Sequence, residues 1–218
     1  MPVLLVTGFE AFGDHPANPT ADGVRALARD PAFESRVAFA ILPVTFAGAP
    51  AVLRARMRRE RVIACVMFGL AAGERDVRVE YAAYSEGDPS LVDNSGLVRK
   101  AVEQPHGPVR VVAGALVEIA EEALRRVSAP VRISGDPGRY VCNATYYAAL
   151  QANAPRSSSA VFVHVPATRS IGGEFEDDVV QRWMRAVVAG VLADVEATVD
   201  PPLRAIDGVP LSGSNTGT

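Results

Sequence analysis

The sequence predicts an α/β protein: a single-domain, three-layer α/β/α sandwich with a central, mostly parallel (mixed) sheet. Two features of the chain lead to this class. Short β-branched apolar runs alternate with longer segments of helical periodicity, which is typical of strands joined by crossover helices. Several of these runs are apolar at every position, as expected for strands that helices cover on both faces. With 218 residues, of which 49% are hydrophobic, the chain is long enough to bury a sizeable core.

Strands are expected at the apolar runs, which lie at residues 3–6, 36–42, 62–68, 76–84, 130–133 and 160–165. The run at 76–84 alternates between apolar and polar residues at first, which predicts a half-exposed strand. Helices are expected between and after the strands, at residues 20–28, 49–59, 111–127, 143–152 and 174–198. Thr20 is the expected N-cap of the first helix.

The remaining segments set the expected limits of the domain. Residues 85–108 form a long irregular segment with two turn signals, and loops of this length in a compact domain are usually functional. Residues 1–200 are expected to form one domain. The chain after it ends in Gly, Ser and Thr, so residues 201–218 are expected to be a disordered tail.

The charge pattern argues against nucleic-acid and membrane partners. The 22 basic and 25 acidic residues are interleaved, so no basic patch is expected, and no apolar run approaches the roughly 18 residues that a membrane-spanning helix needs. The apolar N-terminus lacks a preceding basic region, which indicates a strand and not a signal peptide. The two cysteines form neither a disulfide framework nor a C-x-x-C pair, so we expect a cytoplasmic protein without a metal site.

Cys142 is the candidate nucleophile. It follows a predicted strand and a tight turn at Gly135, Pro137 and Gly138, so it is expected near the first turn of a helix. Free backbone N–H groups and the helix dipole there are expected to favour the thiolate, which is the nucleophilic form. The alternative is a small buried hydrophobe, because free cysteines are often buried. Cys65, inside an apolar run, is expected to be an inert core residue.

A cysteine nucleophile needs a base, and the chain has three histidines. His15 and His106 lie in irregular segments and are expected at the surface. His164 ends a buried strand, where it is either the catalytic base or a core histidine. Glu80 is the candidate carboxylate that orients the imidazole, and the alternative for it is a solvated residue on a strand.

Several motifs, taken together and in order, resemble those of the type I pyroglutamyl peptidases (pyrrolidone-carboxylate peptidases), a cysteine peptidase family. The resemblance extends over most of residues 4–190. The matching segments are Thr7-Gly8-Phe9-Glu10-Ala11-Phe12-Gly13, Asn18-Pro19-Thr20, Leu42-Pro43-Val44-Thr45-Phe46, the stretch from Gly69 to Glu80, Asp93-Asn94-Ser95-Gly96, Gly138-Arg139-Tyr140-Val141-Cys142-Asn143, and Phe162-Val163-His164-Val165-Pro166.

The resemblance implies a cysteine exopeptidase that removes an N-terminal pyroglutamyl residue from peptides. Cys142 would attack the pyroglutamyl carbonyl, His164 would protonate the leaving amine, and Glu80 would fix the imidazole tautomer. It also implies that no metal or organic cofactor is needed, and that the chain forms dimers or tetramers. The positions that match the family's apolar substrate slot and its polar neighbour are Phe9, Phe12, Asn18, Thr45, Leu91, Tyr140 and Val141.

The segment around Glu80 departs from the family pattern. Where the family has Arg-Ile-Pro before the Asp-Asn turn, this chain has Ser90-Leu91-Val92, and it is that arginine to which oxyanion stabilisation is ascribed. Arg139, three residues before Cys142, is the expected replacement. Arg75 and Arg78 are expected to lie outside the site. The other departures are Glu74 for an arginine, Tyr81 for an arginine and Ser85 for an asparagine.

These departures leave two other functions open. One is a cysteine amidase with the same chemistry that acts on another small cyclic or acyl substrate. The other is a relative without catalytic activity that binds a small ligand on this scaffold.

Overall fold

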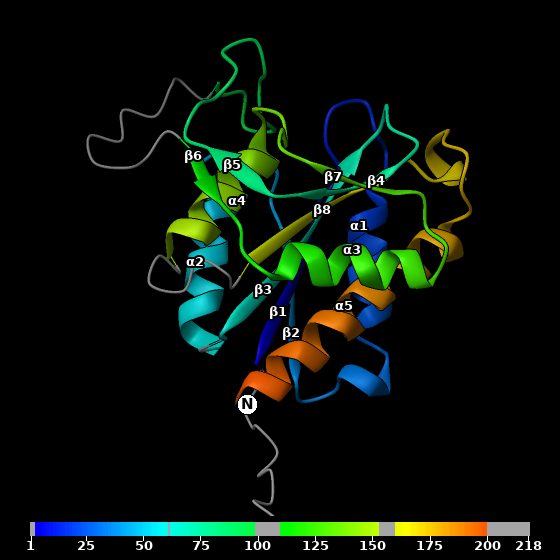
Figure 1. Ribbon diagram of the computed structural model, residues 1–218. Coiled ribbons are helices and arrows are strands. Elements are labelled where there is room, and N and C mark those ends of the chain that lie inside the picture. Colours follow the sequence, from blue (N-terminus) through cyan, green and yellow to red (C-terminus); the bar gives the residue numbers. More distant parts are fainter. Residues whose placement is uncertain (1–2, 61, 99–109, 153–159, 200–218) are drawn as a thin grey trace, which may run out of the picture.

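A computed structural model describes residues 3–60, 62–98, 110–152 and 160–199. They are built around a six-stranded sheet with the strand order β2-β1-β3-β8-β4-β7 (Figure 1). Its strands are β1 (Leu4–Phe9), β2 (Val37–Leu42), β3 (Ala64–Ala71), β4 (Val77–Glu80), β7 (Val131–Ser134) and β8 (Ala160–Pro166). A separate antiparallel pair consists of β5 (Ala82–Tyr84) and β6 (Arg110–Val112).

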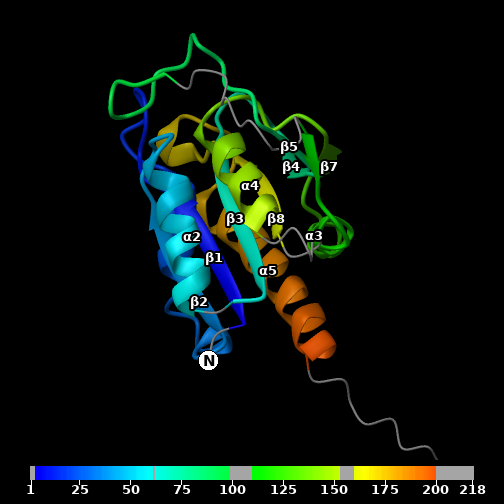
Figure 2. The ribbon, with the colours of Figure 1, turned by 90° about the vertical axis from the view of Figure 1, so that its left-hand side faces the viewer.

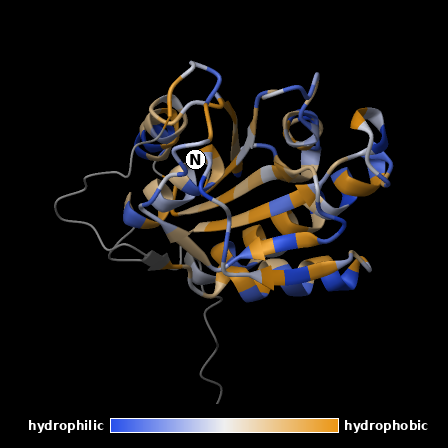
Figure 3. Cartoon of the chain, turned by 90° about the horizontal axis from the view of Figure 1, so that it is seen from above, coloured by the Kyte–Doolittle hydropathy of each residue, from blue (hydrophilic) through white to orange (hydrophobic). Residues whose placement is uncertain are grey.

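Helices cover both faces of this sheet, as predicted. They are α1 (Pro19–Leu27), α2 (Gly48–Glu60), α3 (Leu116–Arg126), α4 (Val141–Ala152) and α5 (Asp177–Val199). Helices α1, α3 and α5 pack on one face, and α2 and α4 lie together on the other (Figures 1 and 2). Each face has its own apolar cluster, and the apolar strands run between them (Figure 3). The predicted α/β/α sandwich is therefore confirmed.

The direction of one strand matters for the site. Strands β1, β2, β3 and β8 run parallel, whereas β4 is antiparallel to β8 and parallel to β7. The sheet is thus mixed. In the β4–β8 register Arg78 lies directly opposite His164, and Glu80 lies opposite Phe162. Opposed residues of neighbouring strands share a face, so all four side chains lie on the same face of the sheet.

Three local predictions were wrong. The run at 76–84 is two strands, β4 and β5, and β4 is largely buried, because a neighbour flanks it on each side. The helix expected from residue 111 begins at Leu116, since residues 110–112 pair with β5 instead. The N-cap of α1 is Asn18, whose side chain accepts a hydrogen bond from the Thr20 N–H. The expected tail at 201–218 lies outside the described residues.

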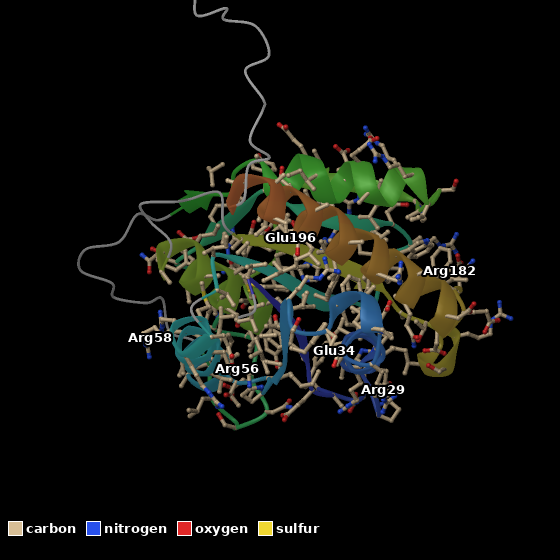
Figure 4. The ribbon with its side chains drawn as sticks, turned by 90° about the horizontal axis from the view of Figure 1, so that it is seen from below. Arg29, Glu34, Arg56, Arg58, Arg182 and Glu196 are labelled. Atoms are coloured by element: carbon tan, nitrogen blue, oxygen red, sulfur yellow. The ribbon has the colours of Figure 1, made fainter. Side chains whose placement is uncertain are left out.

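Charged side chains lie on the outer surfaces of the helices. Arg58 on α2 and Arg182 on α5 are exposed at the rim of the molecule (Figure 4). Most ion pairs at this surface join side chains that water screens, so each contributes little to stability. Across the part of the chain that the structure describes, no helix combines the length and apolar character needed to cross a membrane.

Candidate active site

Cys142 is the second residue of α4, at the end of the strand-turn-helix unit that begins with β7. The turn before it contains Gly138 with φ +78°, a left-handed conformation that glycine adopts without strain. The thiol packs close to Gly69 on β3. A β-carbon at Gly69 would lie 3.0 Å from the Cys142 Sγ and 2.8 Å from the Phe162 ring. Glycine at this position therefore makes room for the thiol.

The protonation state of Cys142 corrects a prediction. Burial raises the pKa of this thiol to about 12, and the negative charge of Glu80 acts in the same direction. Its own backbone N–H and the charge of Arg78 lower the pKa, but by less. The helix start does act as expected, yet the cost of placing a charge among packed atoms outweighs it. Cys142 is therefore a thiol at neutral pH and needs a base when it reacts.

His164 and Glu80 form a buried pair, and His164 belongs to the same cavity lining as Cys142. The His164 Nδ1 lies 2.8 Å from the Glu80 Oε1, and the two side chains are 4% and 0% exposed. With the carboxylate oxygen as acceptor, Nδ1 carries the hydrogen and Nε2 is left to take a proton. The Phe162 ring packs against the imidazole, with 4.7 Å between ring centroids. The structure thus brings together three residues that the sequence separates by as many as 84 positions.

Arg78 was expected to lie outside the site, and this prediction was wrong. Its Nε lies 3.2 Å from the Glu80 Oε1, its Nη2 lies 3.4 Å from the His164 Nδ1, and its side chain is 16% exposed. The reason is the antiparallel direction of β4, which puts Arg78 directly opposite His164. Arg75, by contrast, is exposed and pairs with Glu174 at 2.7 Å.

Cys142 and His164 line the same cavity, which has a volume of about 180 Å³. Its surface is mainly apolar, as expected for a slot that holds a small neutral ring. Four of the predicted substrate residues belong to its lining. The complete lining consists of Phe9, Phe12, Asn18, Val44, Leu70, Ala71, Arg78, Pro137, Tyr140, Cys142 and His164.

Three other predicted substrate residues do not line this cavity. The Thr45 hydroxyl accepts a hydrogen bond from the Gly48 N–H (3.0 Å) at the start of α2. Val141 is fully buried in the core, and Leu91 is 37% exposed. Their contact with substrate stays a prediction.

Asn18 lines the cavity and also organises its wall. The side-chain Oδ1 accepts from the backbone N–H and the hydroxyl of Thr20 (3.1 and 2.8 Å), and Nδ2 donates to the Glu10 carbonyl (3.0 Å). The Thr20 hydroxyl in turn accepts from the Phe9 N–H (3.0 Å). This chain of hydrogen bonds joins the end of β1 to the start of α1 and fixes the loop that carries Phe12.

The turn at residues 93–96 ties together the loops after β1 and β2. The Asp93 carboxylate accepts from the Phe46 N–H (2.7 Å). The Asn94 N–H donates to the Val44 carbonyl (3.0 Å), and its side-chain amide donates to the Ala11 carbonyl (2.9 Å). Sequence reasoning found this turn as a motif but did not identify its role, which is to hold two cavity loops in place.

Asn143 is a structural residue of the site that sequence reasoning missed. Its Oδ1 accepts from the Tyr84 N–H (2.8 Å), and its Nδ2 donates to the carbonyls of Tyr84 and Glu86 (2.9 and 3.2 Å). A fully buried amide next to the nucleophile thereby secures the loop that follows β5. The feature of the sequence that could have identified Asn143 is its position directly after Cys142.

Arg139 does not line the cavity. Its guanidinium lies 2.6 Å from the Asp136 carboxylate and 3.7 Å from that of Glu86, and it stacks over the Tyr84 ring at 4.1 Å. The expected replacement for the oxyanion arginine is therefore engaged elsewhere. Among the arginines that the structure describes, Arg78 is the one in the cavity lining.

Comparison with known proteins identifies the family. The model of the family described as pyroglutamyl peptidase matches residues 2–200. The chain belongs to the pyroglutamyl peptidase family. It is 33% identical over 168 residues to the pyrrolidone-carboxylate peptidase of Thermococcus kodakarensis, covering 75% of this chain and 80% of that protein. The pyrrolidone-carboxylate peptidase of Deinococcus radiodurans is 34% identical over 176 residues, and the match covers 78% of this chain and 81% of that protein.

Solved structures of pyroglutamyl peptidases have the same fold. The pyrrolidone carboxyl peptidase of Thermococcus litoralis superposes with a TM-score of 0.81 at 24% identity, covering 91% of this chain and 96% of that one. Pyroglutamyl peptidase I of Bacillus amyloliquefaciens superposes with a TM-score of 0.78 at 22% identity, and the match covers 87% of this chain and 96% of that one. At these identities the likeness extends to the fold alone.

Proposed function

We propose that this protein is a cysteine exopeptidase that removes the N-terminal pyroglutamyl residue from peptides. The observation that carries the proposal is the His164–Glu80 hydrogen bond, formed at the wall of the cavity that also holds the Cys142 thiol. A thiol, an imidazole and an orienting carboxylate are the parts that acyl transfer by a cysteine nucleophile requires. Membership of the pyroglutamyl peptidase family supplies the substrate class.

The reaction begins with a neutral thiol. The pyroglutamyl ring occupies the mainly apolar cavity, and the His164 Nε2 takes the Cys142 proton as Sγ bonds to the pyroglutamyl carbonyl carbon. Backbone N–H groups in the first turn of α4 have no acceptor within the helix and favour the resulting oxyanion. The imidazolium then gives its proton to the leaving amine, and the peptide departs without its first residue.

Water completes the cycle. The intermediate is a thioester between Cys142 and the pyroglutamyl group. His164 removes a proton from water as the water attacks the thioester carbonyl, and the thiol is then released with pyroglutamate. Throughout, the Glu80 carboxylate holds the Nδ1–H and stabilises the charge that forms on the ring.

One observation favours a second candidate function. A family slot for a neutral lactam needs no cation, yet the Arg78 guanidinium belongs to the cavity lining. A related cysteine amidase would use Cys142, His164 and Glu80 in the same way. Its substrate would be a small acyl group that carries one more oxygen atom, which would accept a hydrogen bond from Arg78. Comparison of a pyroglutamyl amide with amides of other small acids, at equal concentration, separates the two activities.

The experiment that tests the proposal is hydrolysis of a chromogenic pyroglutamyl amide. Wild-type protein should release the chromophore, and Cys142→Ser should lower kcat by about a thousandfold or more, because a serine hydroxyl is a far weaker nucleophile. Cys65→Ala is the matched control, since Cys65 is fully buried in β3. An inactive wild type that still binds the substrate would indicate the non-catalytic relative, and an active Cys142→Ser would exclude the mechanism.

The assembly and compartment form part of the same proposal. We propose one catalytic domain over residues 1–200, a homodimer or homotetramer, and a reducing cytoplasm. The two free cysteines agree with a reducing compartment, and exposed Val92 and Leu97 (55% and 60%) supply apolar surface for self-association. Light scattering coupled to size-exclusion chromatography measures the assembly, and a single 23 kDa species at all concentrations would contradict it.

A further inference from the structure

We propose that Arg78 is a positioning residue of the active site: its guanidinium holds the Glu80 carboxylate in place, and Glu80 in turn orients His164. The proposal rests on the proposed function for the role of His164. The contact between Arg78 and Glu80 does not depend on which acyl group is the substrate.

The register of β4 and β8 fixes Arg78 at the catalytic pair. Arg78 is the residue directly opposite His164, and Glu80 follows it two positions later on the same strand. Side chains two apart on a strand share a face, so Arg78 and Glu80 both lie beside the imidazole. This position is set by backbone pairing and does not depend on the conformation of a loop.

Glu80 depends on Arg78 for its counter-charge. The carboxylate is 0% exposed, and its Oε1 lies 2.8 Å from the His164 Nδ1 and 3.2 Å from the Arg78 Nε. The approach of Arg78 is an ion pair without hydrogen-bond geometry, and among the described residues neither the Arg78 Nε nor the Glu80 Oε2 has a hydrogen-bond partner. The guanidinium is charged at every physiological pH, so Arg78 is the permanent positive charge beside this carboxylate. A buried carboxylate without a cation is unfavourable and tends to protonate or turn away.

Arg78 acts on His164 through Glu80. The His164 Nδ1 donates its hydrogen to Glu80, so it has no lone pair to accept from the Arg78 Nη2, which is 3.4 Å away. The remaining contact is the ion pair with Oε1. Arg78 therefore controls where the carboxylate lies, and the carboxylate controls which imidazole nitrogen carries the hydrogen.

Glu74 supports Arg78 from the other side. The Arg78 Nη1 donates to the Glu74 Oε1 (3.0 Å), and Arg132 on β7 contacts the Glu74 Oε2 (3.1 Å). Glu74 thereby anchors the far side of the Arg78 guanidinium and is itself held by a second arginine.

The test combines kinetics with a signal that needs no substrate. Arg78→Met should lower kcat by about tenfold or more with KM changed less than about threefold, because the substrate is bound but the base is misaligned. In nitrogen-15-labelled protein, the downfield proton resonance of the His164 Nδ1–H should be present in wild type and lost or broadened in Arg78→Met. His164→Ala assigns that resonance among the three histidines.

Matched variants separate positioning from other roles. Arg78→Lys should recover part of kcat and of the Nδ1–H resonance, and Glu74→Gln should give the Arg78→Met pattern in weaker form. Arg75→Met, which alters an exposed arginine three positions earlier, should leave both readouts unchanged. If Arg78→Met does not fold, Arg78→Lys and Glu74→Gln still test the proposal. A wild-type kcat and a wild-type Nδ1–H resonance in both variants would overturn it.

Two results would overturn the proposal in a folded Arg78→Met protein. Unchanged kcat together with an unchanged resonance would show that Glu80 needs no guanidinium. An increase in KM at constant kcat would make Arg78 a substrate contact and not a positioning residue. An altered resonance in a protein that cleaves no pyroglutamyl amide would support the positioning role while rejecting the proposed substrate, so the two failures are distinguishable.

Discussion

The cavity has two walls that differ in how the chain builds them. An aromatic wall, formed by Phe9, Phe12 and Asn18, follows the end of β1 and is held by short-range hydrogen bonds. A charged wall, formed by Arg78 and His164 with Glu80 buried behind them, comes from two antiparallel strands. The first wall is therefore set by neighbours along the chain, whereas the second is set by the pairing of strands that lie far apart in the sequence.

The largest expected effect falls on the charged wall. His164→Ala should lower kcat by about a thousandfold or more, because every proton transfer in the reaction passes through its imidazole. Steady-state hydrolysis of a pyroglutamyl amide measures this effect, with circular dichroism as a check on folding. A loss of less than about tenfold would remove His164 from the mechanism and leave the charged wall without a catalytic role.

The rate at which iodoacetamide alkylates Cys142 should rise steeply with pH. The thiolate is the reactive form, and the Cys142 pKa is raised to about 12, so the thiolate fraction grows about tenfold per pH unit between pH 7 and 9. Mass spectrometry of the Cys142 peptide gives the rate, and fully buried Cys65 serves as the unreactive control. A plateau that begins below pH 7 would show that Cys142 is a preformed thiolate.

Glu80→Gln should cost less than His164→Ala, by a factor of about ten or more. Glutamine keeps a carbonyl oxygen that accepts the Nδ1–H, but it no longer stabilises the charged ring. The ratio of kcat values for the two variants tests this order. Equal and small losses in both would show that the Cys142–His164–Glu80 assignment is wrong.

On the aromatic wall the expected effect is on binding. Phe12→Ala should raise KM by about tenfold with kcat changed less than about threefold, since an apolar contact of roughly 1.4 kcal/mol is lost equally from the ground state and the transition state. A tenfold fall in kcat would indicate that the aromatic wall also orients the reacting carbonyl. The two walls would then not differ in function as proposed.

The smallest expected effect is that of Arg139→Ala, with kcat and KM within about threefold of wild type. Arg139 pairs with Asp136 and Glu86 away from the cavity, and exposed ion pairs contribute little. The sequence alone suggests about a hundredfold loss, on the reasoning that Arg139 replaces the family's oxyanion donor. A hundredfold loss of kcat would show that Arg139 does stabilise the oxyanion, and that its side chain moves into the cavity when substrate binds.

Local patterns in the sequence predicted most elements of the sheet and both layers of helices. The errors in the strands have one cause. Residues 76–84 and 110–112 contain short segments whose partners lie far along the chain, and periodicity shows which residues share a face but not which strand will pair with them. The thiol of Cys142 illustrates the same limit, because its helix position was apparent whereas the atoms that bury it were not.

The sequence by itself determined that Cys142 lies near the start of a helix after a tight turn, that Phe9 and Phe12 lie close together along the chain, and that the chain resembles the pyroglutamyl peptidases. These properties depend on neighbouring residues or on motifs. The tertiary structure decided that β4 runs antiparallel to β8, and with it that Arg78 faces His164 while Arg139 turns away. Strand direction depends on contacts between segments more than 80 residues apart, and such contacts leave no local pattern in the sequence.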